Sequence, residues 1–231
     1  MKIDFSAIPI YCLTSETDEP GIRKSHIREQ FSTAVDFVNP ILGIAKNKSG
    51  ATGVIRILEK GLRSQIPGKP FAPFLLIEDN VSIHNRGVDS TVVDIPDNTD
   101  LFYIGISNCS MNDHRIHCAN YYESVPEYPG VVRIKHMLST HGIMICSPLA
   151  AAVVQRAMLE VFLTDYPWDV PLAFIQPYYN VYALKTPYIY QDSSYGGYEP
   201  QTRISLDGPD HPLPAEWVTS DLCAIRMIFR S

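Results

Sequence analysis

Short apolar runs alternate with amphipathic stretches along most of the chain, and this alternation predicts strands and helices in turn. The apolar runs predict strands at residues 8–13, 71–77, 101–106, 131–137, 140–146 and 180–184. Apolar residues at helical spacing predict helices at 22–37, 51–62 and 148–161, with at most a short helix at 168–176. The chain therefore opens as strand, helix, helix, strand, which favours an α/β domain.

Polar sequence separates these elements and marks where some of them begin. Ser49 is placed to cap the second helix, and Ser147 followed by Pro148 is a typical start for the third. Residues 107–130 show no sustained period, which is typical of a long loop that covers or lines a binding site. Residues 82–100 are polar and irregular. We expect one domain over 1–231, with residues 190–231 as an irregular tail packed on it.

The composition is that of an ordinary globular protein, with 45% hydrophobic and 19% charged residues. The apolar runs are shorter than a membrane-spanning helix. The start of the chain lacks the basic residues and the long apolar centre of a secretory signal. We therefore expect a cytoplasmic protein with no membrane span. The five cysteines are odd in number and lie mostly in apolar sequence, which indicates reduced thiols rather than a disulfide framework.

The charge balance bears on the class of partner. The net charge is −6 and the pI is near 5.6, and no cluster of Lys and Arg is interleaved with aromatic residues. This pattern argues against nucleic acid as a partner. The 13 tyrosines suit stacking on sugars or bases, and they equally suit half-buried packing.

The most informative stretch is residues 71–81, FAPFLLIEDNV, where an apolar run ends in the two acids Glu78 and Asp79. Open α/β sheets bind ligands just beyond the carboxyl ends of their strands. Adjacent carboxylates at that place suit a Mg²⁺ or Mn²⁺ ion that bridges a diphosphate. An exposed loop start, where acids are common, is the alternative interpretation.

Six segments in chain order resemble the glycosyltransferases of family 25, the group of lipooligosaccharide-biosynthesis enzymes and collagen galactosyltransferases. They are IYCLT with Arg23 downstream, GATGVIRILEKGL, LLIEDNV, LFYIG, STHGIMICSPLAAAVVQRAM and PWDVPLAFIQPYYNVYALKTPYIYQ, and they span about residues 7–192. The resemblance implies a GT-A nucleotide-sugar fold, with a single mixed, mainly parallel central sheet flanked by helices. It implies metal-dependent transfer of a hexose or deoxyhexose from a nucleotide sugar, expected to be UDP-linked, to a hydroxyl of an oligosaccharide or glycan acceptor.

The resemblance also implies a metal site. Asp79 is the first-choice ligand for Mn²⁺ or Mg²⁺, with Glu78 and Asn80 beside it, and His141 and His211 are further candidates. An isolated histidine is, however, more often a packing or surface residue.

The donor and acceptor residues follow from the same resemblance. Tyr11 and Thr14 are expected contacts of the base and the ribose, while Arg23 and Arg56 would contact the diphosphate or the base. Gly53 would permit close approach of the nucleotide, or it would simply sit at the start of a helix. For the arginines, the alternative is an ordinary solvated charge.

Asp169 is the candidate for the base that takes a proton from the attacking hydroxyl, or for a carboxylate that orients the acceptor. An Asp at a helix start that is stabilised by the free amides there is the alternative.

One departure from the family bears on the metal. The family usually has two acids after the Glu, which gives an acid-any-acid spacing, whereas this chain has Glu78, Asp79 and Asn80 in a row. An amide oxygen is a poorer metal ligand than a carboxylate. Either Asp79 holds the cation while Glu78 faces the ribose or a backbone amide, or the metal is bound weakly and mostly by the diphosphate.

Two other functions stay open. A binding module of the same fold without catalysis fits the Asn80 departure, and a metal-dependent phosphohydrolase would need further acids or histidines close to Asp79. A zinc site formed by His114, His117 and Cys118 is disfavoured, because a structural zinc needs four ligands and no second pair with ligand spacing lies near them.

Overall fold

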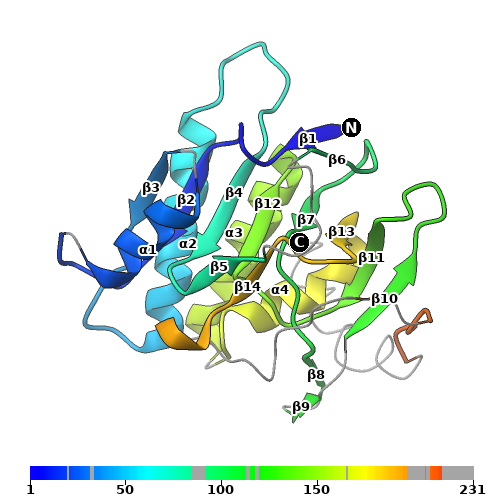
Figure 1. Cartoon of the computed structure of the whole chain (residues 1–231). Helices are drawn as coiled ribbons and strands as arrows, with labels where there is room; N and C mark the ends of the chain where they lie inside the picture. The colour runs from blue at the N-terminus through cyan, green and yellow to red at the C-terminus, as the bar shows by residue number, and fades with distance from the viewer. Residues whose placement is uncertain are drawn as a thin grey trace.

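The computed structural model describes residues 1–19, 21–31, 34–84, 92–112, 115–117, 120–164, 166–196, 206 and 209–214. Its centre is an eight-stranded sheet with the strand order β10-β11-β13-β7-β12-β4-β2-β3 (Figure 1). The strands are β2 (Ile10–Leu13), β3 (Val35–Val38), β4 (Phe74–Glu78), β7 (Leu101–Tyr103), β10 (Tyr121–Ser124), β11 (Val131–His136), β12 (Gly142–Ile145) and β13 (Val181–Leu184). The predicted α/β class, with a mixed sheet flanked by helices, is confirmed.

The sheet is mixed in a specific way. The pairs β2–β3, β2–β4 and β13–β7 are parallel, and the other four neighbouring pairs are antiparallel. Because only β12 and β11 run against the rest, six of the eight strands still point the same way. The expectation of a mainly parallel sheet therefore agrees with the common direction of most strands, but most neighbouring pairs are antiparallel. The carboxyl ends of β2 and β4 lie next to each other, and we call this end of the two strands the β2–β4 edge.

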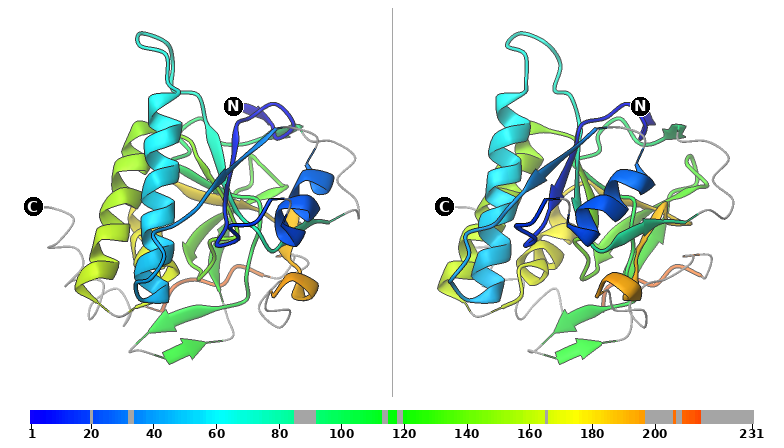
Figure 2. Two further views of the ribbon diagram at one scale, coloured as in Figure 1. Left: turned by 90° about the vertical axis from the view of Figure 1, so that its left-hand side faces the viewer. Right: turned by 60° about the vertical axis from the view of Figure 1, so that its left-hand side comes forward.

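Helices cover both faces of the sheet (Figure 2), and an apolar cluster lies between the helices and the sheet on each face. On one face, α2 (Lys46–Arg63), α3 (Pro148–Leu163) and α4 (Asp169–Ile175) share a core cluster with Phe74 and Leu76. On the other face, α1 (Ile22–Gln30) shares a second cluster with Leu75 and Ile77. The alternation of side chains along β4 explains why an unbroken apolar run is buried on both faces.

The predicted helix at 22–37 is wrong in its second half. Helix α1 ends at Gln30, Phe31 is extended, and Val35–Val38 forms β3, which pairs in parallel with β2. The valines and the phenylalanine of β3 favour a strand, and the pairing of this segment with β2 makes it a strand and not a helix. The predicted cap at Ser49 is also wrong. Helix α2 begins at Lys46, and the Ser49 hydroxyl donates a hydrogen bond to the carbonyl of Ile41 at 2.8 Å.

Two segments expected to be irregular contain short strands. Residues 82–100 include part of β5 (Val81–Ile83) and β6 (Val92–Asp94), and β6 pairs with β1 (Lys2–Asp4). Residues 107–130 include β10 and the small pair β8 (Ser110–Asn112) and β9 (Arg115–His117).

The expected tail is ordered at its beginning. β14 (Ile189–Gln191) pairs with β5, and a short 3-10 helix, η2 (Ser193–Tyr195), follows it. A second such helix, η1 (Gln176–Tyr178), continues α4. Most of 197–231 lies outside the described residues. Within the described part of the chain, no helix has both the length and the apolar character needed to cross a membrane.

Candidate functional site

The carboxyl ends of β2 and β4 bring Thr14 and Asp79 into contact. Leu13 and Glu78 are register partners, so the next residue on each strand emerges at the same edge of the sheet. The Thr14 hydroxyl donates a hydrogen bond to Asp79 Oδ2 at 2.6 Å, and both side chains are buried. Thr14, which was predicted to contact the base or the ribose, and Asp79, which was predicted to bind the metal, therefore contact each other.

Arg23 completes this contact from the first turn of α1. Its guanidinium donates to Asp79 Oδ1 at 3.0 Å, and its side chain is 39% exposed against 8% for Asp79. The carboxylate of Glu16 accepts the backbone N–H of Arg23 at 3.3 Å and that of Lys24 at 3.0 Å, which fixes the start of the helix. The Arg23 charge is thus held beside Asp79 while part of its side chain is exposed to solvent.

Glu78 points to different partners from its neighbour. It accepts hydrogen bonds from the Thr140 hydroxyl at 2.6 Å and from the Gln191 amide at 3.1 Å. Burial raises the pKa of Glu78 to about 7, against the effect of these two hydrogen bonds, and the charges of Asp169 and Asp79 raise it further. Glu78 and Asp79 therefore diverge, and their carboxylates have different environments.

Asp169 lies near Glu78, at the start of α4. Burial raises the pKa of Asp169 to about 6, although the backbone N–H groups of Asp169 and Val170 lower it in part. Trp168, just before it, packs on α2: a Cβ at Gly50 would lie 2.8 Å from the indole Nε1. The hydrogen bonds from the backbone N–H groups of Asp169 and Val170 agree with the interpretation of Asp169 as a residue that stabilises the helix start, and its role as a base stays a prediction.

His141 lies at the same edge, one residue before the pair formed by Gly142 and Ile77. Its Nδ1 is 3.1 Å from the Ser139 hydroxyl, and its Nε2 is buried without a hydrogen-bond partner among the described residues. Burial lowers the pKa of His141 to about 4, so the imidazole is neutral at physiological pH. A neutral imidazole has one unprotonated nitrogen that can bind a ligand or accept a hydrogen bond, but a pKa of about 4 makes it a weak proton acceptor at neutral pH.

Arg56 and Gly53 contact the site indirectly. The Arg56 guanidinium donates to the carbonyl of Asn39 at 2.8 Å, and the Asn39 side chain donates to the carbonyls of Thr14 and Glu16. A Cβ at Gly53 would lie 2.1 Å from a terminal methyl of Leu13. In this structure Gly53 therefore lets α2 approach the end of β2.

Two other sequence candidates lie apart from Asp79. Tyr11 is buried in the core, where its ring packs edge to face on Phe74 with centroids 5.7 Å apart. His211 donates from Nδ1 to the carbonyl of Asn120 at 2.7 Å and bridges to β10, at the far edge of the sheet. Since β10 is five strands from β4, the separation is roughly 24 Å.

The segment 189–196 forms contacts that the sequence did not indicate. The N–H of Asp192 donates to the carbonyl of Asn80 at 2.7 Å, and its carboxylate accepts from the Ser82 hydroxyl at 2.7 Å. Nε2 of His26 lies 2.9 Å from that hydroxyl and 3.0 Å from the carbonyl of Val81, so this nitrogen carries a proton. Tyr195 stacks on the His26 ring at 3.9 Å. The segment therefore covers the residues that follow Asp79.

The metal site predicted from the sequence, with Asp79 and Asn80 as ligands, stays a prediction: both Asp79 oxygens already accept hydrogen bonds, from Thr14 and from Arg23. Asn80 Oδ1 is buried and has no hydrogen-bond partner among the described residues, and Asn80 follows Asp79 directly in the sequence. Within the described part of the chain, no three His, Cys, Asp or Glu side chains are grouped as a metal site. Mg²⁺ sites commonly use one or two protein oxygens and take the rest from phosphate and water, so two ligands suffice.

The sequence also contains the H-x-x-H-C cluster. His114 and Cys118 lie outside the described residues, and His117 belongs to β9.

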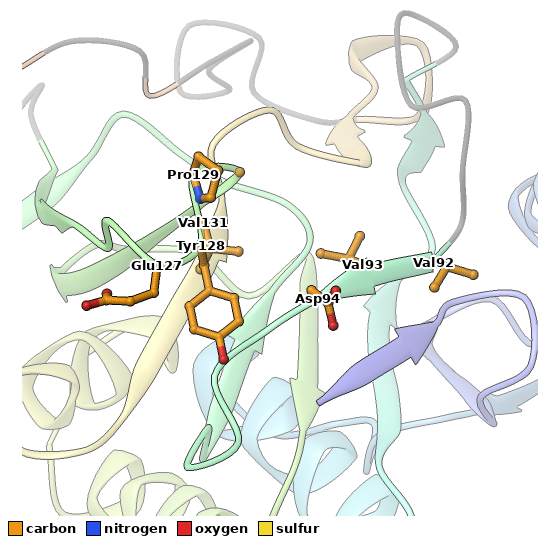
Figure 3. A pocket seen from close by; sticks show the side chains of 8 residues that line it. Val92, Val93, Asp94, Glu127, Tyr128, Pro129 and Val131 are labelled. Atoms are coloured by element: carbon orange, nitrogen blue, oxygen red, sulfur yellow. The ribbon is translucent and has the colours of Figure 1, made fainter.

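A cavity of about 600 Å³ lies elsewhere on the molecule (Figure 3). Tyr128 and Asp94 line it together with Val92, Val93, Glu127, Pro129, Gly130 and Val131. None of the candidate residues at the β2–β4 edge contributes to it.

No protein-family model matches the chain, and no curated protein sequence matches it.

Proposed function

We propose that the chain is a cytoplasmic, nucleotide-sugar-dependent glycosyltransferase of the GT-A kind. It would move a hexose or deoxyhexose from a UDP-linked donor to a hydroxyl of an oligosaccharide or glycan. The observation that carries the proposal is the cluster of Thr14, Arg23 and Asp79 at the carboxyl ends of two adjacent parallel strands. Ligands of α/β sheets bind at such ends.

Arg23 supplies the charge complement to a diphosphate. A guanidinium offers several N–H groups in a planar array that matches phosphate oxygens. Since the Arg23 side chain is 39% exposed, it is accessible to a ligand without unfolding of the site. The half-exposed arginine beside a buried carboxylate thus favours an anionic ligand with a bound cation.

Asp169 takes the proton in the proposed reaction. The acceptor oxygen forms a bond to the anomeric carbon, the bond from that carbon to the diphosphate oxygen breaks, and the electron pair leaves with the diphosphate. The acceptor proton passes to the Asp169 carboxylate. With a pKa of about 6, this carboxylate is ionised at neutral pH and basic enough to accept the proton.

A Mn²⁺ or Mg²⁺ ion held by Asp79 and Asn80 would act as a Lewis acid toward the leaving diphosphate. Thr14 holds the Asp79 carboxylate in place through its 2.6 Å hydrogen bond. Neutral His141 is a further polar group at this edge.

Thermal unfolding with a panel of nucleotides and nucleotide sugars tests the proposal. A ligand that binds only the folded state raises the unfolding temperature. We expect UDP and one UDP-sugar to do so with Mn²⁺ present, and we expect Asp79→Ala to remove the effect. Asp36→Ala is a matched control, because Asp36 forms its ion pair with Lys60 away from this edge. No shift with any nucleotide would reject the proposal.

A turnover assay separates the rival functions. A glycosyltransferase releases UDP from the donor that gives the thermal shift. Metal-dependent binding without release of UDP from any donor would favour a binding module, which the Asn80 departure supports. Release of inorganic phosphate would favour a phosphohydrolase.

A further inference from the structure

Three large aliphatic side chains project from the turn that precedes α2. Ile41, Leu42 and Ile44 are 44%, 54% and 43% exposed, and Gly43 between them has a φ of +82°. That backbone conformation is one that residues with a side chain rarely adopt. The turn therefore has a defined shape that places neighbouring apolar side chains in solvent.

Hydrogen bonds from α2 hold this turn in place. The N–H of Ile41 donates to the Thr52 hydroxyl at 2.8 Å, and the carbonyl of Ile41 accepts from the Ser49 hydroxyl at 2.8 Å. Both hydroxyls belong to the first turns of the helix. These hydrogen bonds thus fix the backbone that carries the apolar side chains. The exposure of these side chains to water is unfavourable, and folding of the chain does not remove it.

A second group of exposed apolar residues lies at the end of α3. Leu159, Phe162 and Leu163 are 46%, 39% and 79% exposed. Helices α2 and α3 pack side by side, and both views in Figure 2 show the start of α2 beside the end of α3. The packing of Trp168 on Gly50 connects the same two regions. We call Ile41, Leu42, Ile44, Leu159, Phe162 and Leu163 together the apolar tip.

Positive charge borders the turn at 41–44 of the apolar tip, although the whole chain carries a net charge of −6 and one acid, Asp165, follows Leu163 by two positions in the sequence. Lys46 and Lys48 follow the turn directly, and no Asp or Glu occurs between Pro40 and Leu58. Glu160, on α3, is buried and paired with Arg156 at 3.3 Å. Exposed aliphatic side chains bordered by lysines are the combination that binds an anionic lipid surface.

We propose that the apolar tip docks on the surface of a membrane that contains anionic lipids. The aliphatic side chains enter the boundary between headgroups and acyl chains, and Lys46 and Lys48 contact the lipid phosphates. A second copy of the chain is a less suitable occupant, because a symmetric contact would bring the lysines of both copies together. Docking at this end of the molecule would place the start of α4 near the bilayer, since Trp168 packs on Gly50.

Vesicle flotation of the full chain tests the proposal without nucleotide, so its result does not depend on the proposed transferase activity. Vesicles of phosphatidylcholine alone are compared with vesicles in which a third of the lipid is phosphatidylglycerol. We expect binding to the anionic vesicles that weakens as salt is added. No binding to anionic vesicles at low salt would overturn the proposal.

Variants assign the binding to the apolar tip. The double variant Leu42→Ser, Ile44→Ser should weaken vesicle binding at least tenfold, because each aliphatic side chain loses its favourable transfer from water. Lys46→Glu should weaken it by about fivefold or more, with little effect on phosphatidylcholine vesicles. The matched control is Ile66→Ser, which changes a side chain that is 67% exposed at the other end of α2.

Two results would contradict the assignment. Equal loss of binding in the Ile66→Ser control would show that general surface hydrophobicity drives the binding. A dimer of the wild-type chain in sedimentation that the Leu42→Ser, Ile44→Ser variant dissociates would assign the apolar tip to a contact between copies. Circular dichroism of each variant checks that the fold is retained.

Discussion

The Arg23–Asp79 ion pair predicts that Arg23 weakens divalent-cation binding before any nucleotide is present. Both oxygens of Asp79 are engaged, Oδ1 by Arg23 at 3.0 Å and Oδ2 by Thr14 at 2.6 Å. A cation on Asp79 must therefore share the carboxylate with a guanidinium of the same sign. The change Arg23→Gln removes the charge and keeps a polar side chain.

The expected gain can be estimated from the charges. A doubly charged ion and a guanidinium that share one carboxylate lie on the order of 5 Å apart, so at the dielectric constant of water they repel by about 1.7 kcal/mol. The value for water is suitable because the Arg23 side chain is 39% exposed. Salt screening reduces the repulsion. We expect Arg23→Gln to bind Mn²⁺ about tenfold more tightly at low ionic strength.

The assay is a Mn²⁺ titration followed by the electron paramagnetic resonance signal of the free ion, with no nucleotide present. Arg28→Gln is the control, since Arg28 lies on the same helix, has a similar exposure of 48% and pairs with Glu19 instead. For UDP the prediction has the opposite sign: Arg23→Gln should bind it more weakly, because a phosphate contact is lost. Unchanged or weaker Mn²⁺ binding by Arg23→Gln would refute the reasoning, as would an equal gain in Arg28→Gln.

Two further predictions concern single residues of the site. Thr14→Val should lower the free energy of unfolding by about 1.5–3 kcal/mol, because buried Asp79 loses a hydrogen bond to its charge; urea denaturation measures this, and a Thr14→Ser variant as unstable as Thr14→Val would argue against that hydrogen bond. For Asp169, the base must be ionised to accept a proton, so kcat/KM for transfer should fall tenfold per pH unit below about pH 6. Asp169→Asn should lose transfer and keep UDP binding. If kcat/KM of that variant instead falls below about pH 6 as it does in the wild type, Asp169 is not the base and only stabilises the start of α4.

The central strands of the sheet could be predicted because a strand that is buried on both faces consists of uninterrupted apolar residues. Strands β4 and β12 lie within the predicted runs at 71–77 and 140–146, apart from Glu78 at the end of β4. Edge strands carry no such signal: β3 is half exposed along most of its length, and β10 ends in Glu123 and Ser124. Their conformation is decided by pairing with a neighbour, which a local pattern does not record.

The same limit applies to the partners of the site residues. The run ending in Glu78 and Asp79 predicted that these acids lie at the end of a buried strand, as they do, whereas their role in a nucleotide site and that of Arg23 stay predictions. The partners of Glu78 were not predictable, since Thr140 and Gln191 are 62 and 113 residues away and are ordinary polar residues. Only the tertiary arrangement shows that Glu78 and Asp79 have separate partners.

Register explains which residues of the first strand are available to a ligand. Tyr11 pairs with Leu76 inside the sheet, so its ring belongs to the core and packs on Phe74. Thr14 comes one position after the last register pair, Leu13 with Glu78, and so reaches the rim beside Asp79. In a sheet of this kind, the first residue beyond the paired segment is a better candidate for ligand contact than an aromatic residue within it. By that criterion Thr14 and Asp79 remain the strongest nucleotide-site candidates, and Tyr11 acts through packing.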